Sequence, residues 1–384
     1  MSVSNKKNSV RFSPNLCVTH MCNLNCIYCY QDHDTENRMS FDTACKCIDW
    51  IFENVPSDMN EVEITFIGGE PLLEFELIKK IVDYTCNKNV STPFIFYATT
   101  NGTVLTEEMK QWFRTNKNRF VLGLSLDGMP ETHNFNRSNS FDMIDVDFFI
   151  DTWPNQGIKM TLSEHSLKNL ADNIIYLHNR GFKDIGGVNL FEGTFDWSKE
   201  EYVKILIPEL KKLVEFYVER DDLMLDQMLG RQIDACEEKN RPKRKWCGIG
   251  TGVVFFDTDG TRLPCPFVSP MTFDKDDLDD ILKVDFNDEE SFIDDECFEK
   301  CYIYPICPHC AGANYLSKKT FKESDKSKCR IQKLITLFCA DIHAKRIIKN
   351  PNLYDENRIY HIISAIEKIR ELYLPEFSEY IDIL

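Results

Sequence analysis

Short β-rich runs alternate with helical stretches through the first 220 residues, and this order constrains the fold more than any other feature of the sequence. Several of the runs are apolar or aromatic and bounded by Gly, Asn or Asp, which is typical of buried parallel strands. Strands that alternate with helices form a parallel sheet, so we expect an α/β fold, either a partial or complete barrel or an open doubly wound sheet. The six expected strands are Leu16–Thr19, Val62–Ile67, Phe94–Thr99, Phe120–Leu126, Ile158–Leu162 and Ile185–Leu190.

Helical patterns fill the spaces between these runs, and some carry end signals. Ser40 is a suitable N-cap for the first helix. Gly181 fits the position just past the end of another helix. Ser198 and Glu201 form an S-x-x-E capping box ahead of the last one. The expected helices span residues 41–55, 74–86, 107–114, 141–153, 167–180 and 199–220.

Length and charge exclude several classes of protein. The 384 residues leave room for about two or three domains. The 45 Lys and Arg against 62 Asp and Glu give a net charge of −17, which argues against a nucleic-acid partner because phosphates would be repelled. The first twenty residues hold no apolar signal region, and no run approaches about 18 apolar residues, so we expect a cytoplasmic protein without a membrane span. In a reducing cytoplasm, the 16 cysteines indicate metal binding more than disulfides.

Three cysteines, Cys22, Cys26 and Cys29, form a CxxxCxxC pattern directly after the first expected strand. Iron–sulfur cubanes and structural zinc sites take four ligands, so three thiolates leave one metal position open for a substrate or cosubstrate. In an α/β barrel this is the face on which active sites form. The spacing alone leaves two alternatives, a zinc site completed by His20 or His33, or a chance group of unpaired core cysteines.

The ends of the second and third expected strands carry glycines and polar residues. Gly68 and Gly69 let the backbone approach a ligand closely, and Glu70 offers an acceptor to a bound ammonium group. The sequence Thr-Thr-Asn-Gly at 99–102 follows the third strand. Turn chemistry explains either loop alone, but it explains poorly their occurrence together with the cysteine loop.

The fourth expected strand ends in the sequence Ser-Leu-Asp-Gly. Ser125 and Asp127 are suited to bond ribose hydroxyls. His133 and Arg137 follow, and the guanidinium of Arg137 is suited to hold a carboxylate as a bidentate pair.

Together, the CxxxCxxC motif with Tyr28 before its last cysteine, the GGEP motif at 68–71 and the SLDG segment with its following His and Arg resemble the radical S-adenosylmethionine superfamily. The resemblance implies a partial (β/α)6 barrel over residues 12–220 and a 4Fe–4S cluster on Cys22, Cys26 and Cys29, whose open iron S-adenosylmethionine would chelate. It further implies that S-adenosylmethionine is contacted at its methionine end by Gly68, Gly69 and Glu70, near its ribose by Ser125 and Asp127, and near its carboxylate by Arg137.

The same resemblance implies the reaction type. A reduced cluster donates one electron to the sulfonium, and homolysis of a carbon–sulfur bond yields a 5′-deoxyadenosyl radical that abstracts hydrogen from the substrate. The protein positions the target and excludes water, oxygen and competing hydrogen donors. An electron donor such as flavodoxin or ferredoxin is implied as a partner.

Seven further cysteines lie between residues 247 and 329. CxxxC and CxxC pairs suit zinc, for which His309 would be another ligand. Seven thiols exceed one zinc site, and an odd number suits one closed site and one open site. The seven are Cys247, Cys265, Cys297, Cys301, Cys307, Cys310 and Cys329.

The segment 247–330 resembles the SPASM extension of peptide-modifying radical enzymes, although the spacings of its two outer cysteine pairs are exchanged. The resemblance implies two auxiliary 4Fe–4S clusters. One would be closed by Cys297, Cys301, Cys307 and Cys329, and the other held by Cys247, Cys265 and Cys310 with its fourth position open or filled by another ligand. Zinc or a single auxiliary cluster are the alternatives. Six cysteines have no assigned role: Cys17, which lies on the first strand near the active face, and Cys45, Cys47, Cys86, Cys236 and Cys339.

Two further segments complete the expected organisation. Residues 221–246 are expected to form a helix followed by a linker, and the basic run at 241–245 is either a solvated connector or a contact for an acidic partner. Residues 331–384 are expected to form a C-terminal helical segment.

The SPASM resemblance points to a peptide or protein substrate. The leading hypothesis is a maturase of ribosomally made peptides that forms a thioether or another side-chain crosslink. About 20 residues precede Cys22, so we expect no N-terminal leader-binding domain and infer a separate leader-recognition protein or direct leader capture. One alternative is sulfatase-maturase-like formylglycine formation, with Asp257 or Asp259 as base, although their FDTDG sequence predicts a turn. A non-catalytic iron–sulfur or zinc-binding protein is the alternative from another class.

Overall fold

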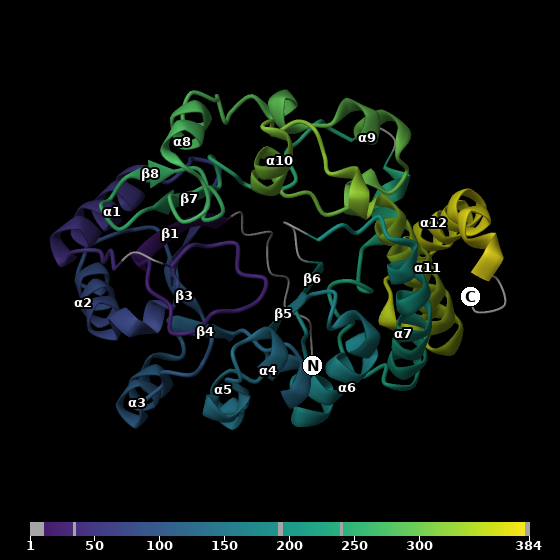
Figure 1. The fold of residues 1–384 in the computed structure, drawn as a ribbon, viewed down its shortest axis with the longest axis horizontal. Helices are drawn as coiled ribbons and strands as arrows, with labels where there is room; N and C mark the ends of the chain where they lie inside the picture. Colours follow the sequence, from purple (N-terminus) through teal and green to yellow (C-terminus); the bar gives the residue numbers. More distant parts are fainter. Residues whose placement is uncertain (1–10, 34–35, 191–194, 239–240, 381–384) are drawn as a thin grey trace. The chain divides into compact units, whose positions relative to one another are not determined.

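The computed structural model describes residues 11–33, 36–190, 195–238 and 241–380, and the chain divides into two compact units. Unit 1 consists of residues 1–125, 142–153 and 247–288, and unit 2 consists of residues 126–141, 154–246 and 289–384. Each unit is assembled from segments that are distant in the sequence, as the colours of Figure 1 show. The cysteine-rich segment that follows residue 246 is therefore shared between the two units.

Unit 1 contains a six-stranded sheet in the order β4–β3–β2–β1–β7–β8, in which every neighbouring pair except β7–β8 is parallel. This confirms the α/β class, and the described strands do not form a closed barrel. β1 to β4 are the first four expected strands. The strand bounds are β1 Arg11–Thr19, β2 Glu61–Gly68, β3 Phe94–Thr100, β4 Phe120–Leu124, β7 Val253–Phe256 and β8 Arg262–Leu263.

Helices α1, α2 and α3 lie along one side of β1–β4 in unit 1 (Figure 1). The fully buried rings of Phe66, Phe96, Phe113 and Phe120 pack between sheet and helix with centroids 5.2 to 6.0 Å apart, and their burial holds the layers together. The Ser40 hydroxyl accepts a hydrogen bond from the Thr43 amide at 3.0 Å, as expected of the N-cap. The helices of unit 1 are α1 Phe41–Glu53, α2 Phe75–Cys86, α3 Glu107–Asn116, α5 Val146–Thr152 and α8 Lys275–Ile281.

Strand β7 was not expected from the sequence, because four apolar residues inside a turn-rich segment carry no strand periodicity. It pairs in parallel with β1, in a register that runs from Ser13 opposite Val253 to Leu16 opposite Phe256. The start of the cysteine-rich segment is thus built into the same sheet as the strand that leads into the first cysteine motif.

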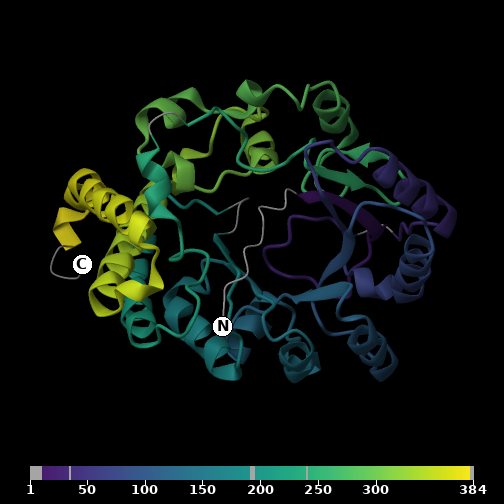
Figure 2. The same cartoon turned by 180° about the vertical axis from the view of Figure 1, so that it is seen from behind.

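Unit 2 contains the fifth and sixth expected strands as a separate two-stranded parallel sheet. Helix α11 packs against α7 and α12, and Figure 2 shows these three helices side by side from behind. Gly181 has a φ of 116° and ends α6 as expected. The elements of unit 2 are β5 Lys159–Leu162, β6 Gly187–Leu190, α4 Pro130–Asn136, α6 Leu170–Arg180, α7 Glu200–Glu219, α9 Asp295–Lys300, α10 Ala311–Lys318, α11 Cys329–Lys349 and α12 Glu356–Tyr373.

Arg346 fastens α11 to the end of α7. Its guanidinium donates hydrogen bonds to the carbonyl oxygens of Tyr217, Arg220 and Leu223 at 2.9 to 3.3 Å. The last carbonyl groups of a helix lack partners within the helix and carry partial negative charge, so a buried cation there is stabilising.

Two local expectations were wrong. Lys199, not Ser198, is the N-cap of α7, and its side chain, which has no acceptor, makes no capping bond. The Ser198 hydroxyl donates to Asp196 at 2.5 Å instead of capping the helix. In the described part of 221–246, the one helical element is the 3₁₀ turn Ile233–Glu237, not an α-helix. The basic run packs on α9: Arg241 donates to the Phe298 carbonyl at 2.7 Å and Lys243 pairs with Asp295 at 3.1 Å. None of the described helices is long and apolar enough to cross a membrane.

Candidate functional site

The three thiols of the first cysteine motif lie together on an irregular loop after β1, which we call the cysteine loop (residues 20–33). Cys22 and Cys26 are half-buried and Cys29 is exposed. The Cys29 amide donates to the Cys26 carbonyl at 3.0 Å, which closes a turn. Burial raises the pKa of the Cys22 thiol to about 11, and the charges of Cys26 and Cys29 add to the shift because the three sulfurs are neighbours. The three thiols are accessible, and their thiolate forms would repel one another. A bound cationic iron–sulfur core would stabilise these thiolates, so the group fits such a core.

Gly68 and Gly69 form a backbone seat for the cysteine loop, which means that the loop backbone packs directly against these two residues. A Cβ at Gly68 would lie 2.1 Å from the Thr19 carbonyl oxygen, and one at Gly69 would lie 2.3 Å from the Met21 carbonyl oxygen. The Gly69 amide also donates to the Thr19 carbonyl at 3.1 Å. The close approach that we expected toward a ligand is therefore, in this structure, an approach to the backbone that carries Cys22.

Glu70 joins the cysteine loop to the end of β3. Its side chain is 1% exposed, and its carboxylate accepts hydrogen bonds from the Thr100 hydroxyl at 2.8 Å and from the Asn101 and Leu72 amides at 2.7 and 3.1 Å. Its own amide donates to the Met21 carbonyl at 2.8 Å. The carboxylate thus has a structural role here, and its contact with an ammonium group stays a prediction.

Asn23 is a residue of the loop that the sequence reasoning missed. Its side chain donates to the Thr103 hydroxyl at 2.8 Å and accepts from the Asn101 side chain at 2.9 Å. The Thr-Thr-Asn-Gly segment after β3 is thereby connected to the cysteine loop between Cys22 and Cys26. Asn23 could have been recognised from the sequence, because it is a polar residue inside a metal-binding loop and the nearby strand end is also polar.

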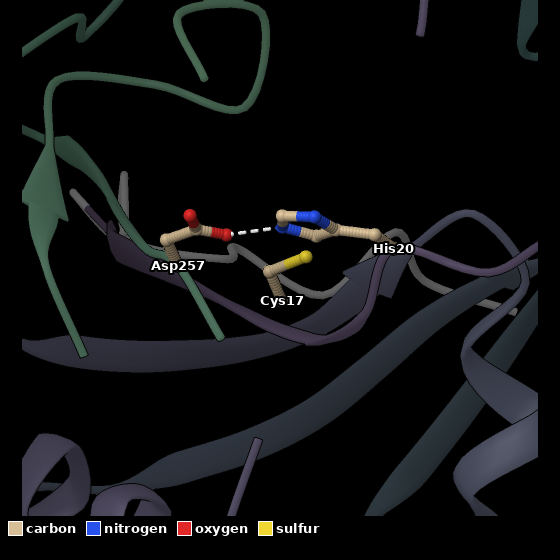
Figure 3. A group of neighbouring side chains, drawn as sticks. All are labelled: Cys17, His20 and Asp257. Carbon is tan, nitrogen blue, oxygen red and sulfur yellow. Dashed lines mark hydrogen bonds and ion pairs between the residues drawn. The ribbon is translucent and has the colours of Figure 1, made fainter. Parts of the chain in front are cut away.

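Cys17, His20 and Asp257 form a buried group at the ends of β1 and β7 (Figure 3). The three residues are at most 5% exposed, and Nε2 of His20 lies 2.6 Å from Oδ1 of Asp257. Two ligands of one tetrahedral zinc ion lie about 3.3 Å apart, so this distance fits a hydrogen bond better than a metal site. Asp257 therefore holds the residue that stands two positions before Cys22. Its engagement with His20 opposes its expected use as a free base, and Asp259 is exposed and accepts from the Thr261 amide within its turn.

His33 closes the other side of the cysteine loop. Its Nδ1 lies 2.9 Å from the His20 carbonyl oxygen and its Nε2 lies 3.3 Å from Sγ of Cys29. The hydrogen bond with Cys29 raises the pKa of His33. Of the two histidines considered as extra zinc ligands, His33 is thus beside a thiol, while the ring of His20 is directed at Asp257.

The residues expected near the ribose and carboxylate of S-adenosylmethionine fall in both units. Ser125 ends unit 1, and its amide donates to the Thr100 carbonyl at 2.9 Å. In unit 2, Asp127 is fully buried and forms an ion pair with Arg137, with Nε 3.0 Å from Oδ2 and Nη2 3.2 Å from Oδ1. Asp127 and Arg137 thus bind each other in this structure, and their contacts with S-adenosylmethionine stay predictions.

His133 supports that ion pair. Its Nδ1 accepts from the Asp127 amide at 3.3 Å, and its Nε2 lies 3.1 Å from the Ser140 hydroxyl. Burial lowers the pKa of His133 to about 4, so the ring is neutral near pH 7 and can accept and donate in this arrangement.

Four of the later cysteines line one cavity in unit 2, which we call the four-cysteine cavity: Cys297, Cys301, Cys307 and Cys329. Its volume is about 550 Å³ including the space that opens to solvent. The cysteines come from helix ends, with Cys297 in α9 and Cys329 at the start of α11. Burial raises the pKa of Cys307 to about 12. Four thiols around one cavity fit a closed 4Fe–4S site better than a zinc site, because no three of these sulfurs lie within 4.8 Å of one another, as the ligands of one zinc ion would.

Lysines surround the same cavity. Nζ of Lys326 lies 2.7 Å from Sγ of Cys297 and 2.8 Å from Asp294, whose carboxylate also accepts from the Cys297 amide. Lys328 and Lys333 line the cavity, and Lys328 is buried. Cations around four thiolates offset the negative charge that a tetrathiolate site concentrates in a low dielectric.

The remaining cysteines of the SPASM-like segment lie in different units. Cys247 and Cys265 are neighbours in unit 1, where the Gly250 amide donates to the Pro264 carbonyl at 2.9 Å and draws the two strand ends together. Burial raises the pKa of Cys265 to about 12, and the charge of Cys247 adds to the shift. Cys310 lies in unit 2 as the N-cap of α10, where its sulfur accepts from the Ala313 amide at 3.4 Å.

Comparison with known proteins finds a match to the family model of the Radical SAM superfamily over residues 16–206. An uncharacterized protein of Methanocaldococcus jannaschii is 31% identical over 263 residues, which cover 65% of this chain and 82% of the relative. A cysteine-type anaerobic sulfatase-maturating enzyme of Clostridium perfringens is 25% identical over 322 residues, 74% of this chain and 84% of the enzyme. The subtilosin biosynthesis protein AlbA of Bacillus subtilis is 27% identical over 217 residues, 51% of this chain and 46% of AlbA.

Solved structures share the fold. The structure of anSMEcpe with bound AdoMet superposes with a TM-score of 0.67 at 18% identity, covering 92% of this chain and 98% of that one. The structure of Streptococcus suis SuiB bound to its precursor peptide SuiA superposes with a TM-score of 0.55 at 15% identity, covering 83% of this chain and 75% of that one.

Proposed function

Because the chain belongs to the radical SAM superfamily, we propose that it is a maturase that modifies a ribosomally made peptide, forming a thioether or another side-chain crosslink after hydrogen abstraction. The observation that carries the proposal is the pair of cysteine sites, the open three-thiol loop beside the GGE motif and the four-cysteine cavity. The likeness to AlbA and SuiB supports a peptide substrate, because these are a bacteriocin biosynthesis protein and a protein solved with its precursor peptide.

In this proposal the cysteine loop holds the 4Fe–4S cluster through Cys22, Cys26 and Cys29. When bound together with S-adenosylmethionine, the cluster supplies the radical that removes a hydrogen atom from the substrate. The chain's own contribution is position: Gly68 and Gly69 support the loop backbone, Glu70 ties it to β3, and the hydrogen bond between His20 and Asp257 ties it to β7.

The auxiliary sites have different ligand sets in this proposal. Cys297, Cys301, Cys307 and Cys329 hold a closed 4Fe–4S cluster in the four-cysteine cavity. Cys247, Cys265 and Cys310 hold a second cluster whose remaining position is open to a substrate thiolate or another ligand. An open iron can bind the cysteine sulfur that a thioether crosslink requires.

Formylglycine formation is the second candidate function. The cysteine-type sulfatase-maturating enzyme favours it, because the match covers 84% of that enzyme. The state of the two candidate bases opposes it, because Asp257 is buried and bound to His20 while Asp259 is exposed in its turn. Crosslink formation is therefore the first choice.

The proposed partners follow from the reaction. A one-electron donor such as flavodoxin or ferredoxin reduces the first cluster. A separate leader-recognition protein, or the chain itself, binds the leader of the peptide substrate. Neither nucleic acid nor a membrane has a role in the reaction, which we place in the cytoplasm.

Metal analysis and cofactor cleavage test the superfamily chemistry in this chain. Anaerobically purified protein should contain about 12 iron atoms per chain if it holds three clusters, and about eight if it holds two. With dithionite and S-adenosylmethionine it should release 5′-deoxyadenosine. Zinc as the dominant metal, or no 5′-deoxyadenosine from protein with its full iron, would contradict the proposal.

Mass spectrometry then separates the two candidate functions. The chain is co-expressed with short cysteine-containing peptides encoded beside its gene and, in parallel, with a cysteine-type sulfatase. A crosslink removes two hydrogen atoms from the peptide, whereas formylglycine formation replaces the cysteine sulfur of the sulfatase by oxygen and also removes two hydrogen atoms. Modification of the sulfatase alone would overturn the first choice in favour of the second.

A further inference from the structure

A second cavity of unit 2 lies at the C-terminal end of β6, and we call it the β6 cavity. Its volume is about 710 Å³ including the space that opens to solvent. Strand residues Val188, Asn189 and Leu190 form one wall, and Gln332 and Ile335 of α11 form another. In parallel α/β proteins the C-terminal ends of strands are where ligands bind.

Arg231 is the charged side chain among the described residues that line the β6 cavity. Its Nη2 donates to Oε1 of Gln332 at 2.6 Å, which fixes the plane of the guanidinium. Its Nη1 is buried and has no hydrogen-bond partner in the structure. A buried N–H group of a cation without an acceptor is unfavourable, so this nitrogen is prepared for an acceptor that binds from outside the chain.

No acid among the described residues forms an ion pair with Arg231. The buried carboxyl of Asp226 is the acid whose charge reaches it, but Oδ1 of Asp226 accepts from the Met228 and Leu229 amides at 2.8 and 3.2 Å. Burial raises the pKa of Asp226 to about 6, so this carboxyl is mostly ionised near pH 7 and contributes a nearby negative charge. The guanidinium of Arg231 nevertheless has no acid hydrogen-bonded to it among the described residues, and its Nη1 keeps an unused donor.

The rest of the β6 cavity has the composition of a ligand site. Met228, Leu190 and Ile335 give it an apolar base, while Trp246 is 46% exposed and offers a ring face at its edge. Apolar walls with a few convergent polar groups are typical of sites that bind small molecules or peptide side chains. Trp246 contacts the ring of His309 edge to face, with centroids 6.0 Å apart.

The β6 cavity adjoins the proposed auxiliary centres. Pro308, His309 and Gln332 line both this cavity and the four-cysteine cavity, so the two share a wall. Cys310, a proposed ligand of the second auxiliary cluster, lines the β6 cavity as well. A group bound to Arg231 would thus hold a peptide beside Cys310.

We propose that the β6 cavity binds a carboxylate of the substrate peptide, with the guanidinium of Arg231 as its partner. The inference rests on the proposed function, because it names a feature of the same peptide substrate. A guanidinium presents its N–H groups in a planar fork that matches the two oxygens of a carboxylate. The carboxylate is either an Asp or Glu side chain or the C-terminus of the peptide, and the test distinguishes these sources.

Saturation-transfer NMR on the anaerobic, iron-loaded protein tests the inference with three capped peptides. Acetyl-Gly-Glu-Gly-amide carries a side-chain carboxylate, acetyl-Gly-Gly-Gly carries a C-terminal one, and acetyl-Gly-Gln-Gly-amide carries none. We expect binding of the first, the second or both, and not of the third. The variant Arg231→Gln should weaken that binding about tenfold or more, and Arg231→Lys should weaken it less.

Arg220→Gln is the matched control, because Arg220 lies on the surface of the same unit and already pairs with Asp222. It should bind the peptides like the wild type. If Arg231→Gln does not fold, Trp246→Ala tests the same cavity at an exposed position and should also weaken binding. The inference would be wrong if the wild type bound the neutral peptide equally well or bound no peptide at all. It would also be wrong if the variant used, Arg231→Gln or Trp246→Ala, bound the peptides like the wild type.

Iron content and 5′-deoxyadenosine release, measured on the same samples, separate this inference from the proposed function. Arg231→Gln should keep the iron content of the wild type. A loss of auxiliary iron with unchanged peptide binding would show that Arg231 serves the cluster, and the inference would be wrong. Protein that binds carboxylate peptides but never cleaves S-adenosylmethionine would contradict the proposed function and leave the carboxylate site in place.

Discussion

The cysteine loop of unit 1 and the four-cysteine cavity of unit 2 gather thiols in opposite ways. The loop takes three cysteines from eight consecutive residues, leaves Cys29 exposed and is shaped by backbone contacts with Gly68 and Gly69. The cavity takes four half-buried cysteines from residues 297–329 and surrounds them with lysines. In the proposed function, the first arrangement leaves a cluster position for an outside ligand, whereas the second supplies all four ligands of its cluster. The two sites should therefore respond differently to mutation.

Loss of one cysteine from each site gives the largest expected difference. Cys26→Ala should abolish 5′-deoxyadenosine release and remove about four iron atoms per chain. Cys307→Ala should remove a similar amount of iron but keep 5′-deoxyadenosine release, because it leaves the cysteine loop intact. Iron analysis and product chromatography measure both effects. Equal loss of 5′-deoxyadenosine release in both variants would contradict the expectation that the two sites respond differently.

Gly69→Ala tests whether the cysteine loop depends on its backbone seat. The new Cβ would lie 2.3 Å from the Met21 carbonyl oxygen, so the loop must move away from the position that holds Cys22. We expect the amount of the first cluster to fall at least several-fold. EPR of the reduced protein measures this amount. Gly186→Ala is the control, because its Cβ meets no atom closer than 3.5 Å and should change nothing. Normal loading of Gly69→Ala would show that the seat is dispensable.

Asp257→Asn tests the bond that anchors the loop to β7. The amide can still contact His20, but it replaces a charged acceptor, so the free energy of unfolding should fall by about 2 kcal/mol. Urea unfolding of the metal-free protein gives the value. Asp259→Asn, exposed two residues away, is the matched control and should lie within about 0.5 kcal/mol of the wild type. If both substitutions changed the free energy of unfolding equally, the contact between His20 and Asp257 would contribute nothing measurable to stability.

Lys326→Met gives the smallest effect and applies only to the four-cysteine cavity. Removing the ammonium group 2.7 Å from Sγ of Cys297 should lower the reduction potential of the cluster there by on the order of 50 mV, with solvent screening because Lys326 is half exposed. The potential of the cluster in the cysteine loop should not change. Lys300→Met, which removes an exposed lysine of α9, is the control in the same EPR titration. An unchanged auxiliary potential would show that Lys326 only stabilises Asp294.

Much of the fold follows from sequence patterns. All six expected strands exist, because each has enough apolar or aromatic residues to be recognised without its neighbours. Strand β7 escaped prediction because four residues become a strand only through pairing with β1. The Ser198–Glu201 capping box failed because Asp196 competes for the Ser198 hydroxyl, a choice that local spacing does not reveal.

The site was predictable in its residues but less so in their contacts. Motif spacing identified Gly68, Gly69 and Glu70, yet in the structure they bind the backbone of the cysteine loop and the end of β3. Asp127 and Arg137 were expected to face different groups of one cofactor, and they pair with each other. Spacing indicates which residues share a strand end, but it cannot show which of them satisfy one another's charge.

The pairing of β1 with β7 has a consequence for the order of events during synthesis. β1 leaves the ribosome well before β7, because Val253 lies far downstream of its partner Ser13 in the chain. Until then one edge of β1 is an open strand that can pair with other chains, and His20 lacks the acidic partner that follows β7. The cysteine loop therefore reaches its final position only after β7 and Asp257 have been synthesised. Insertion of iron into an incomplete nascent chain would meet a loop that is not yet shaped to receive it.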